Sequence, residues 1–310
     1  MTPTPLAVHV GPDPVEALTA AVLRAGGRLV PLEEAEALVY CGSGGPAELR
    51  GMLHGLHGLH GRIRWVQLPA AGVEAWMEAG VITDDPVFTT AVGAYGTPVA
   101  EHALALMLAA ARGLPQAARA RSWGPPATRE FAGSTVAVVG CGGIGRALIR
   151  LLEPFGCRVL AVSDSGPVAG AERTVPRAAY REVLAEADHV VVAAPATPQT
   201  RGMFGADEFA LMREDAWLVN VARGSLVVTD DLAEAVKNGV IGGAALDVTD
   251  PEPLPAEHPL WELDRVLITP HSANPRPSYW RGLAARVEEN VRRVAEGQAP
   301  LGVVSPARGF

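Results

Sequence analysis

Several features are scarce in this sequence, and each scarcity argues against a class of protein. The chain of 310 residues has a net charge of −8 and no block of basic residues, so nucleic acid or an anionic membrane is not expected as its main partner. Its longest apolar run, residues 103–111, is far shorter than the roughly 18 residues that a membrane span requires. The first residues also lack the basic segment that opens a signal peptide. We therefore expect a soluble, cytoplasmic protein.

Cysteine is also scarce. Cys41, Cys141 and Cys157 are odd in number and widely spaced, which suggests neither a disulfide framework nor a zinc site. Because Cys141 lies inside a glycine turn, we interpret it as a small filler residue rather than a redox group.

Histidines recur at His54, His57 and His60 with glycine and leucine between them. On a helix this spacing could bring two imidazole rings together in a metal site. The glycines weaken such a helix, however, and no carboxylate or cysteine is adjacent. We favour a surface helix with a slipped repeat and predict no metal site.

A buried strand near the middle of the chain runs into a glycine turn and then into a helix. Residues 136–139 are almost wholly apolar, which is typical of a parallel strand covered on both faces. The G-x-G-x-x-G motif that follows permits a tight turn, close approach of a pyrophosphate to the backbone, and packing of the helix on the strand. The free amides at the helix start would face the phosphates. The sequence therefore predicts a dinucleotide site formed by Gly140, Gly142, Gly143, Ile144 and Gly145.

Strand and helix patterns alternate along the chain, and its length favours two domains of unequal size. In the N-terminal part we predict strands at 6–10, 29–30, 37–40, 64–68 and 87–91, a helix at 15–25, and loops at 42–46 and 69–73. This alternation indicates a small parallel α/β unit. A glycine-containing segment at 93–98 is the predicted linker.

The segment 99–112 is apolar nearly all round. A helix without a polar face must be covered on every side, so we expect it between domains or between subunits, and we predict a homodimer through it. His102 lies in this helix. It could be catalytic, but we favour a histidine held within the packed helix.

Polar residues follow the strands predicted in the C-terminal half at 157–162, 190–194, 216–220, 243–247 and 266–269. In a doubly wound sheet the carboxyl ends of parallel strands meet at one edge, where the ligand sits. Arg223, Glu252 and His271 stand just past such ends. Asp164, 19 residues after Gly145, stands where an acid would hold the ribose hydroxyls of a dinucleotide. A last helix, 281–295, is predicted to return to the first domain.

Together these motifs resemble the D-isomer-specific 2-hydroxyacid dehydrogenase family. The segments that carry the resemblance are 71–73, 99–102, 140–145, 195–200, 220–225, 244–248, 251–253 and 269–271. They cover nearly the whole chain in order and identify the family rather than a substrate. The resemblance implies a doubly wound Rossmann NAD-binding domain, 94–273, inserted in a smaller flavodoxin-like parallel α/β substrate domain, 1–93 and 274–310.

The resemblance also implies a reaction, the NAD-dependent interconversion of a 2-oxo acid such as glyoxylate or hydroxypyruvate and a D-2-hydroxy acid. Arg223 matches the family's arginine, which would hold the substrate carboxylate and polarise the carbonyl group. His271 matches the acid/base, and Glu252 matches the carboxylate that pairs with it. The amides of Ala71 and Gly72 would hold the substrate carboxylate from the small domain, and the site would form when the domains close.

The cofactor preference is tied to the end of the second nucleotide-domain strand. The family's ribose-binding acid usually stands at the position of Ser163, whereas Asp164 follows one residue later. Because Asp164 would repel a 2′-phosphate, we predict NAD, with NADP as the alternative. Besides the glycine turn, the implied cofactor residues are Ser163, Asp164, Ala194, Pro195, Thr200, Val221, Ala222, Arg223, Asp247 and His271.

Other proteins with this scaffold supply the alternatives. A formate dehydrogenase is disfavoured because Glu252 stands where a glutamine is expected. A phosphite dehydrogenase stays open. An NAD-sensing dimeric regulator of the same fold is disfavoured because no disordered tail or apolar peptide-docking extension is identified. A catalytically silent scaffold is disfavoured because Arg223, Glu252 and His271 are all present.

Overall fold

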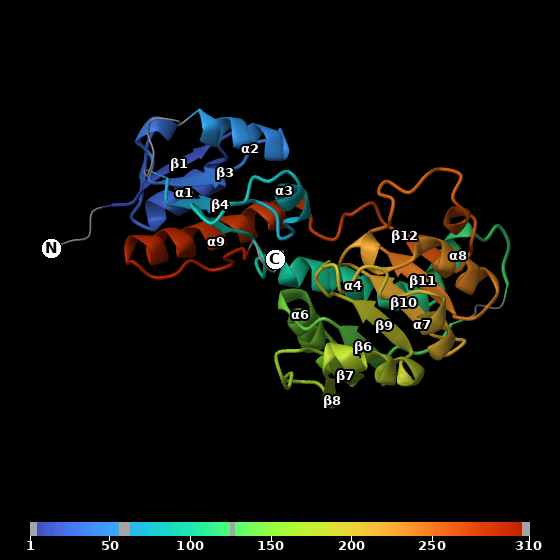
Figure 1. Cartoon of the computed structure of the whole chain (residues 1–310). Helices are drawn as coiled ribbons and strands as arrows, with labels where there is room; N and C mark the ends of the chain where they lie inside the picture. Colours follow the sequence, from blue (N-terminus) through green and yellow to red (C-terminus); the bar gives the residue numbers. More distant parts are fainter. Residues whose placement is uncertain (1–4, 56–62, 125–127, 306–310) are drawn as a thin grey trace. The chain divides into compact units, whose positions relative to one another are not determined.

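A computed structural model describes residues 5–55, 63–124 and 128–305 (Figure 1). The chain divides into two compact units, one formed by Met1–Tyr95 with Arg276–Phe310 and the other by Gly96–Pro275. Each unit is built on a parallel sheet, so the predicted two-domain α/β fold is confirmed. Within the described ranges no helix is both long and apolar enough to cross a membrane.

The unit that contains the N-terminus has a sheet of five parallel strands in the order β2-β1-β3-β4-β5, which is the flavodoxin-like order. Its strands are β1 (Ala7–Gly11), β2 (Arg28–Leu29), β3 (Ala37–Tyr40), β4 (Trp65–Gln67) and β5 (Val87–Thr89). Its helices are α1 (Glu16–Arg24), α2 (Gly45–His54), α3 (Glu74–Glu78) and α9 (Arg276–Ala295). The first and last of these helices pack side by side, as Figure 1 shows.

Some boundaries in this unit differ from the predictions. The loop predicted at 42–46 ends early, because α2 begins at Gly45 and takes Pro46 into its first turn, where proline is well tolerated. Helix α9 begins at Arg276 rather than at residue 281. His54 is the last residue of α2, whereas His57 and His60 lie outside the described residues.

The second unit has a sheet of seven parallel strands in the order β12-β11-β10-β9-β6-β7-β8. Its strands are β6 (Thr135–Val139), β7 (Arg158–Val162), β8 (Arg173–Val175), β9 (His189–Val192), β10 (Trp217–Asn220), β11 (Gly243–Leu246) and β12 (Val266–Ile268). Its helices are α4 (Gly96–Ala111), α5 (Leu114–Arg119), α6 (Gly143–Leu152), α7 (Ala206–Leu211) and α8 (Thr229–Lys237). Strand order reverses beside β6, so the switch point of this doubly wound sheet lies between β6 and β9.

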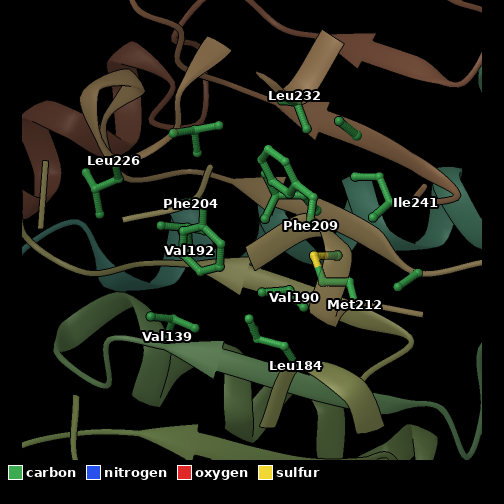
Figure 2. Close-up of a cluster of buried hydrophobic side chains, with 14 of the residues drawn as sticks. Val139, Leu184, Val190, Val192, Phe204, Phe209, Met212, Leu226, Leu232 and Ile241 are labelled. Atoms are coloured by element: carbon green, nitrogen blue, oxygen red, sulfur yellow. The ribbon is translucent and has the colours of Figure 1, made fainter. Parts of the chain in front are cut away.

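Both faces of this sheet are covered, which explains the continuous apolar character of its strands. On one face Val139, Val190 and Val192 pack with Phe204 and Phe209 (Figure 2). On the other face α4 packs against α6, β10 and β11.

Helix α4 begins earlier than predicted. Residues 96–98 were expected in the linker, but they form the first turn of the helix. A Cβ atom on Gly96 would lie 2.6 Å from the carbonyl oxygen of Gly143, so glycine is needed for this close approach. The helix is not covered on every side within the unit, because Glu101 and Ala105 are exposed. The homodimer through this helix stays a prediction.

Candidate active site

The carboxyl ends of the parallel strands in the second unit bring most of the predicted site residues to one edge of the sheet. Gly140 follows β6, Ser163 follows β7, and Val221 follows β10. Asp247 follows β11 directly, and Thr269 follows β12 directly. In this kind of sheet the ligand sits outside that edge.

The three glycines of the turn are required for different reasons. Gly140 has a φ of +98° and a Cβ there would lie 2.5 Å from the backbone of Ala194, so the turn and the neighbouring strand both require glycine. A Cβ on Gly145 would lie 2.2 Å from the carbonyl oxygen of Gly140, which reflects the packing of α6 on the turn. A Cβ on Gly142, however, would meet no described atom within 4 Å. Packing does not require glycine at this position, and a pyrophosphate lying on the backbone would, so the turn fits a dinucleotide.

The residues after β7 form a small polar cluster. The Asp164 carboxylate accepts a hydrogen bond from the backbone N–H of Arg177 at 2.8 Å and pairs with its Nε at 3.3 Å. The hydroxyls of Ser163 and Ser165 lie 2.9 Å apart, and Arg146 of α6 donates to Ser165 at 3.4 Å. Asp164 therefore lies at the predicted end of the strand with its charge partly balanced by Arg177.

The loop after β9 is closed by one threonine. The Thr200 hydroxyl donates to the carbonyl oxygen of Pro195 at 2.7 Å and accepts from the backbone N–H of Thr197 at 2.8 Å. The side chain is buried. Because both hydrogen bonds of the Thr200 hydroxyl are made within the loop, this side chain stabilises the conformation of the segment that follows Ala194.

A buried asparagine shapes the turn that carries Arg223. Asn220 accepts from the backbone N–H of Ala222 at 3.1 Å and donates to the carbonyl oxygen of Arg223 at 2.9 Å. The next residue, Gly224, approaches the loop after β11 so closely that a Cβ would lie 1.9 Å from the carbonyl oxygen of Thr249. These contacts fix the backbone on both sides of the half-buried Arg223.

Two of the predicted catalytic residues, His271 and Glu252, lie in contact. Nδ1 of His271 lies 2.7 Å from Oε1 of Glu252. An ionised carboxylate only accepts hydrogen bonds, so Nδ1 carries the proton in this contact. Nε2 is then the ring atom that remains to exchange a proton with another group.

His271 has a positive φ of 49°. No other non-glycine residue in the described part of the chain has a positive φ. Its N–H donates to the carbonyl oxygen of Asp247 at 2.8 Å. The Asp247 carboxylate accepts from the N–H groups of Ser272 at 2.9 Å and Ala273 at 3.0 Å. Asp247 thus holds the loop on which the histidine sits.

Asp247 is 2% exposed. Burial alone would raise its pKa, but hydrogen bonds from His102, Thr269, Ser272 and Ala273 outweigh that effect and hold the pKa below its usual value. The buried carboxylate is therefore charged at neutral pH.

The predicted substrate loop belongs to the other unit. It runs from β4 to α3, where Ala71 is exposed and Gly72 is half-buried. The Tyr95 hydroxyl donates to the carbonyl oxygen of Pro69 at 2.6 Å, and the N–H of Ala91 donates to that of Ala70 at 3.0 Å. These bonds define the start of the loop, and its role in binding stays a prediction.

The buried thiols are not activated. Burial raises the pKa of Cys41 and of Cys141 to about 11, so both are protonated at neutral pH. Across the described part of the chain, no three potential metal-ligating side chains come together.

The fold and the site define a nicotinamide dinucleotide-dependent oxidoreductase. Residues 104–273 match the family model described as D-isomer specific 2-hydroxyacid dehydrogenase, NAD binding domain. The chain belongs to the D-isomer specific 2-hydroxyacid dehydrogenase family, as its motifs predicted.

Three similar proteins show the extent of the match. A protein of Corynebacterium melassecola, described as an uncharacterized protein in the proB 3′ region, is 44% identical over 219 residues, which cover 68% of this chain and 72% of that protein. The human glyoxylate reductase/hydroxypyruvate reductase is 38% identical over 182 residues, covering 56% of each chain. The crystal structure of a D-isomer specific 2-hydroxyacid dehydrogenase from Xanthobacter autotrophicus Py2 in complex with NADPH and MES has a TM-score of 0.82 at 29% identity, and the match covers 99% of this chain and 100% of that one.

Sequence reasoning missed three residues that support the site. Asn220 shapes the arginine turn, and Thr269 donates to Asp247 at 2.6 Å. His102, interpreted as a packed helix residue, lies 2.9 Å from the Thr269 hydroxyl and 3.3 Å from the Asp247 carboxylate. A polar residue directly at a strand end was the available signal for Asn220 and Thr269, whereas the apolar residues around His102 favoured its interpretation as a packed helix residue.

Proposed function

We propose that this protein reduces a small 2-oxo acid, of the glyoxylate or hydroxypyruvate kind, to the D-2-hydroxy acid with NADH. The observation that supports this most directly is the 2.7 Å contact between His271 and Glu252 at the carboxyl edge of the sheet. The match to the human glyoxylate reductase/hydroxypyruvate reductase supports the substrate class.

In the proposed reaction His271 acts as the general acid. Glu252 keeps a proton on Nδ1 and stabilises the positive charge of the imidazolium form. Nε2–H then donates a proton to the carbonyl oxygen of the 2-oxo acid as it becomes a hydroxyl group. The nicotinamide, when bound, supplies the hydride.

Arg223 is proposed to bind the substrate carboxylate. A guanidinium group offers a planar fork of donors that matches a carboxylate and also polarises a neighbouring carbonyl oxygen. The rigid turn held by Asn220 and Gly224 supports this role, because a fixed backbone reduces the disorder of the side chain on binding. Ala71 and Gly72 are proposed to add backbone donors.

The cofactor is proposed to bind along the turn from Gly140 to Gly145, with its ribose near Ser163. The exposed negative charge of Asp164 favours NAD over NADP, because a 2′-phosphate would lie near it. Arg146 and Arg177 favour the opposite choice, and the Xanthobacter relative was solved with NADPH. A direct comparison of the two cofactors is therefore part of the test.

The test is a rate measurement. Oxidation of NADH and of NADPH is followed at 340 nm with glyoxylate, hydroxypyruvate and pyruvate, and the configuration of each chiral product is determined. We expect turnover of at least one acid, faster with NADH, to the D product. Tight NADH binding without turnover of any acid would contradict the proposal. Light scattering of the same preparation tests the proposed homodimer.

A further inference from the structure

The Asp247 carboxylate is surrounded by hydrogen-bond donors from two distant parts of the chain. Ser272 and Ala273 donate backbone N–H groups, and the Thr269 hydroxyl donates at 2.6 Å. All three lie within a few residues of His271. The remaining donor, His102, comes from α4, 167 residues away from Thr269 in sequence.

The proton positions in this group follow from the donors available. The Asp247 carboxylate is ionised and only accepts, so the short contact uses the single proton of the Thr269 hydroxyl. The Thr269 oxygen can then only accept from His102, whose Nε2 lies 2.9 Å away. Nε2 of His102 therefore carries a proton that is shared between the hydroxyl oxygen and the carboxylate.

This arrangement controls the backbone of the acid/base residue. A non-glycine residue at positive φ is strained, and His271 is held there by its bond to the Asp247 carbonyl oxygen and by the capture of the next two N–H groups. If His102 were lost, the Thr269 hydroxyl could turn toward the carbonyl oxygen of Leu246, which lies 3.5 Å away. The carboxylate would then lose two of its donors.

We propose that His102 is a positioning residue for His271. Its Nε2–H holds the Thr269 hydroxyl and the Asp247 carboxylate in the orientation that fixes the His271 loop. This inference rests on the proposed function, because it assumes that His271 is the general acid. His102 itself contacts no reacting atom in this account.

The experiment compares four forms of the full-length protein: wild type, His102→Ala, His102→Gln and Glu101→Gln. The amide nitrogen of glutamine can take the place of Nε2, so His102→Gln retains the donor. Glu101 is exposed on the same helix and serves as the matched control. For each form we measure kcat, KM for the 2-oxo acid, Kd for NADH, the melting temperature, and deuterium uptake of the peptide that contains residues 271–273.

The expected result is a loss in kcat of about tenfold or more for His102→Ala, because a displaced acid slows proton transfer more than it weakens binding. KM and Kd should change little. The peptide should exchange faster in His102→Ala, whereas His102→Gln should recover most of kcat and of the protection. Glu101→Gln should match the wild type.

Two results would overturn the inference. In one, His102→Ala keeps the wild-type kcat and peptide protection. In the other, both His102 variants lose activity equally as their melting temperatures fall, which indicates a general structural role. If the wild type turns over no 2-oxo acid, the proposed function fails instead, and the exchange measurement still decides whether His102 holds the loop.

Discussion

A buried histidine makes the stability of the nucleotide-binding unit depend on pH. His189 begins β9 with both ring nitrogens lacking a hydrogen-bond partner among the described residues. Burial, reinforced by the charge of Arg129 and opposed by Asp215, lowers the pKa of His189 from 6.5 to about 3. Between these values the unfolded chain binds a proton and the folded chain does not, so stability decreases as the pH falls below 6.5.

The size of the effect follows from the linkage relation. Each pH unit within this window changes the free energy of unfolding by about 1.4 kcal/mol, so lowering the pH from 7 to 5 removes about 2 kcal/mol. In His189→Leu this contribution is absent. Urea unfolding of both proteins at pH 7 and pH 5, followed by circular dichroism, measures the difference. If the wild type and the variant unfold with equal pH dependence, His189 does not produce this effect, whatever the stability of either protein at pH 7.

Three further predictions concern the site. Glu252→Gln should lower kcat by about tenfold, because a neutral amide stabilises the imidazolium form of His271 less well, while NADH affinity measured by fluorescence stays unchanged; weaker NADH binding at unchanged kcat would be evidence against this role. Asp164→Asn should raise NADPH affinity by about five- to tenfold, since a unit charge near a phosphate in water contributes about 1 kcal/mol, and calorimetry that finds no gain would exclude Asp164 as the selector. Gly142→Ala should weaken NADH binding by about 1–3 kcal/mol without lowering the melting temperature. Gly140→Ala, in contrast, should lower the melting temperature. A destabilised Gly142→Ala protein would show that packing, not the cofactor, requires glycine at position 142.

Much of the fold was predictable because buried parallel strands have a strong sequence signature. Residues 136–139 were predicted as a strand and lie in β6, because their apolar side chains are covered on both faces. The strand β8 was not predicted. It has three residues at the edge of the sheet, and only Val175 among them is buried, so its sequence carries little apolar pattern.

The helix boundaries depended on contacts between segments that are far apart. Helix α4 starts at Gly96, whose backbone closely approaches that of Gly143, a contact that no local pattern reveals. Glycine normally favours a linker interpretation, and the prediction of residues 96–98 as linker was wrong for that reason.

The site was predictable where a polar residue follows a strand in a recognised motif. Arg223, Glu252 and His271 were selected in this way, and the structure shows the contact between the last two. The contacts of His102 with Thr269 and Asp247 join α4 to the ends of β11 and β12. Such a link depends on tertiary structure, and the apolar surroundings of His102 in the sequence favoured an inert residue.

A single-turnover experiment with His271→Ala tests directly whether His271 is the general acid. The variant and the wild type are loaded with NADH and mixed with an excess of the 2-oxo acid that the wild type turns over, and the loss of absorbance at 340 nm is followed. We expect that the variant binds NADH with similar affinity but oxidises it about 10²- to 10⁴-fold more slowly. Oxidation at the wild-type rate by the loaded variant would contradict the assignment of His271 as the general acid.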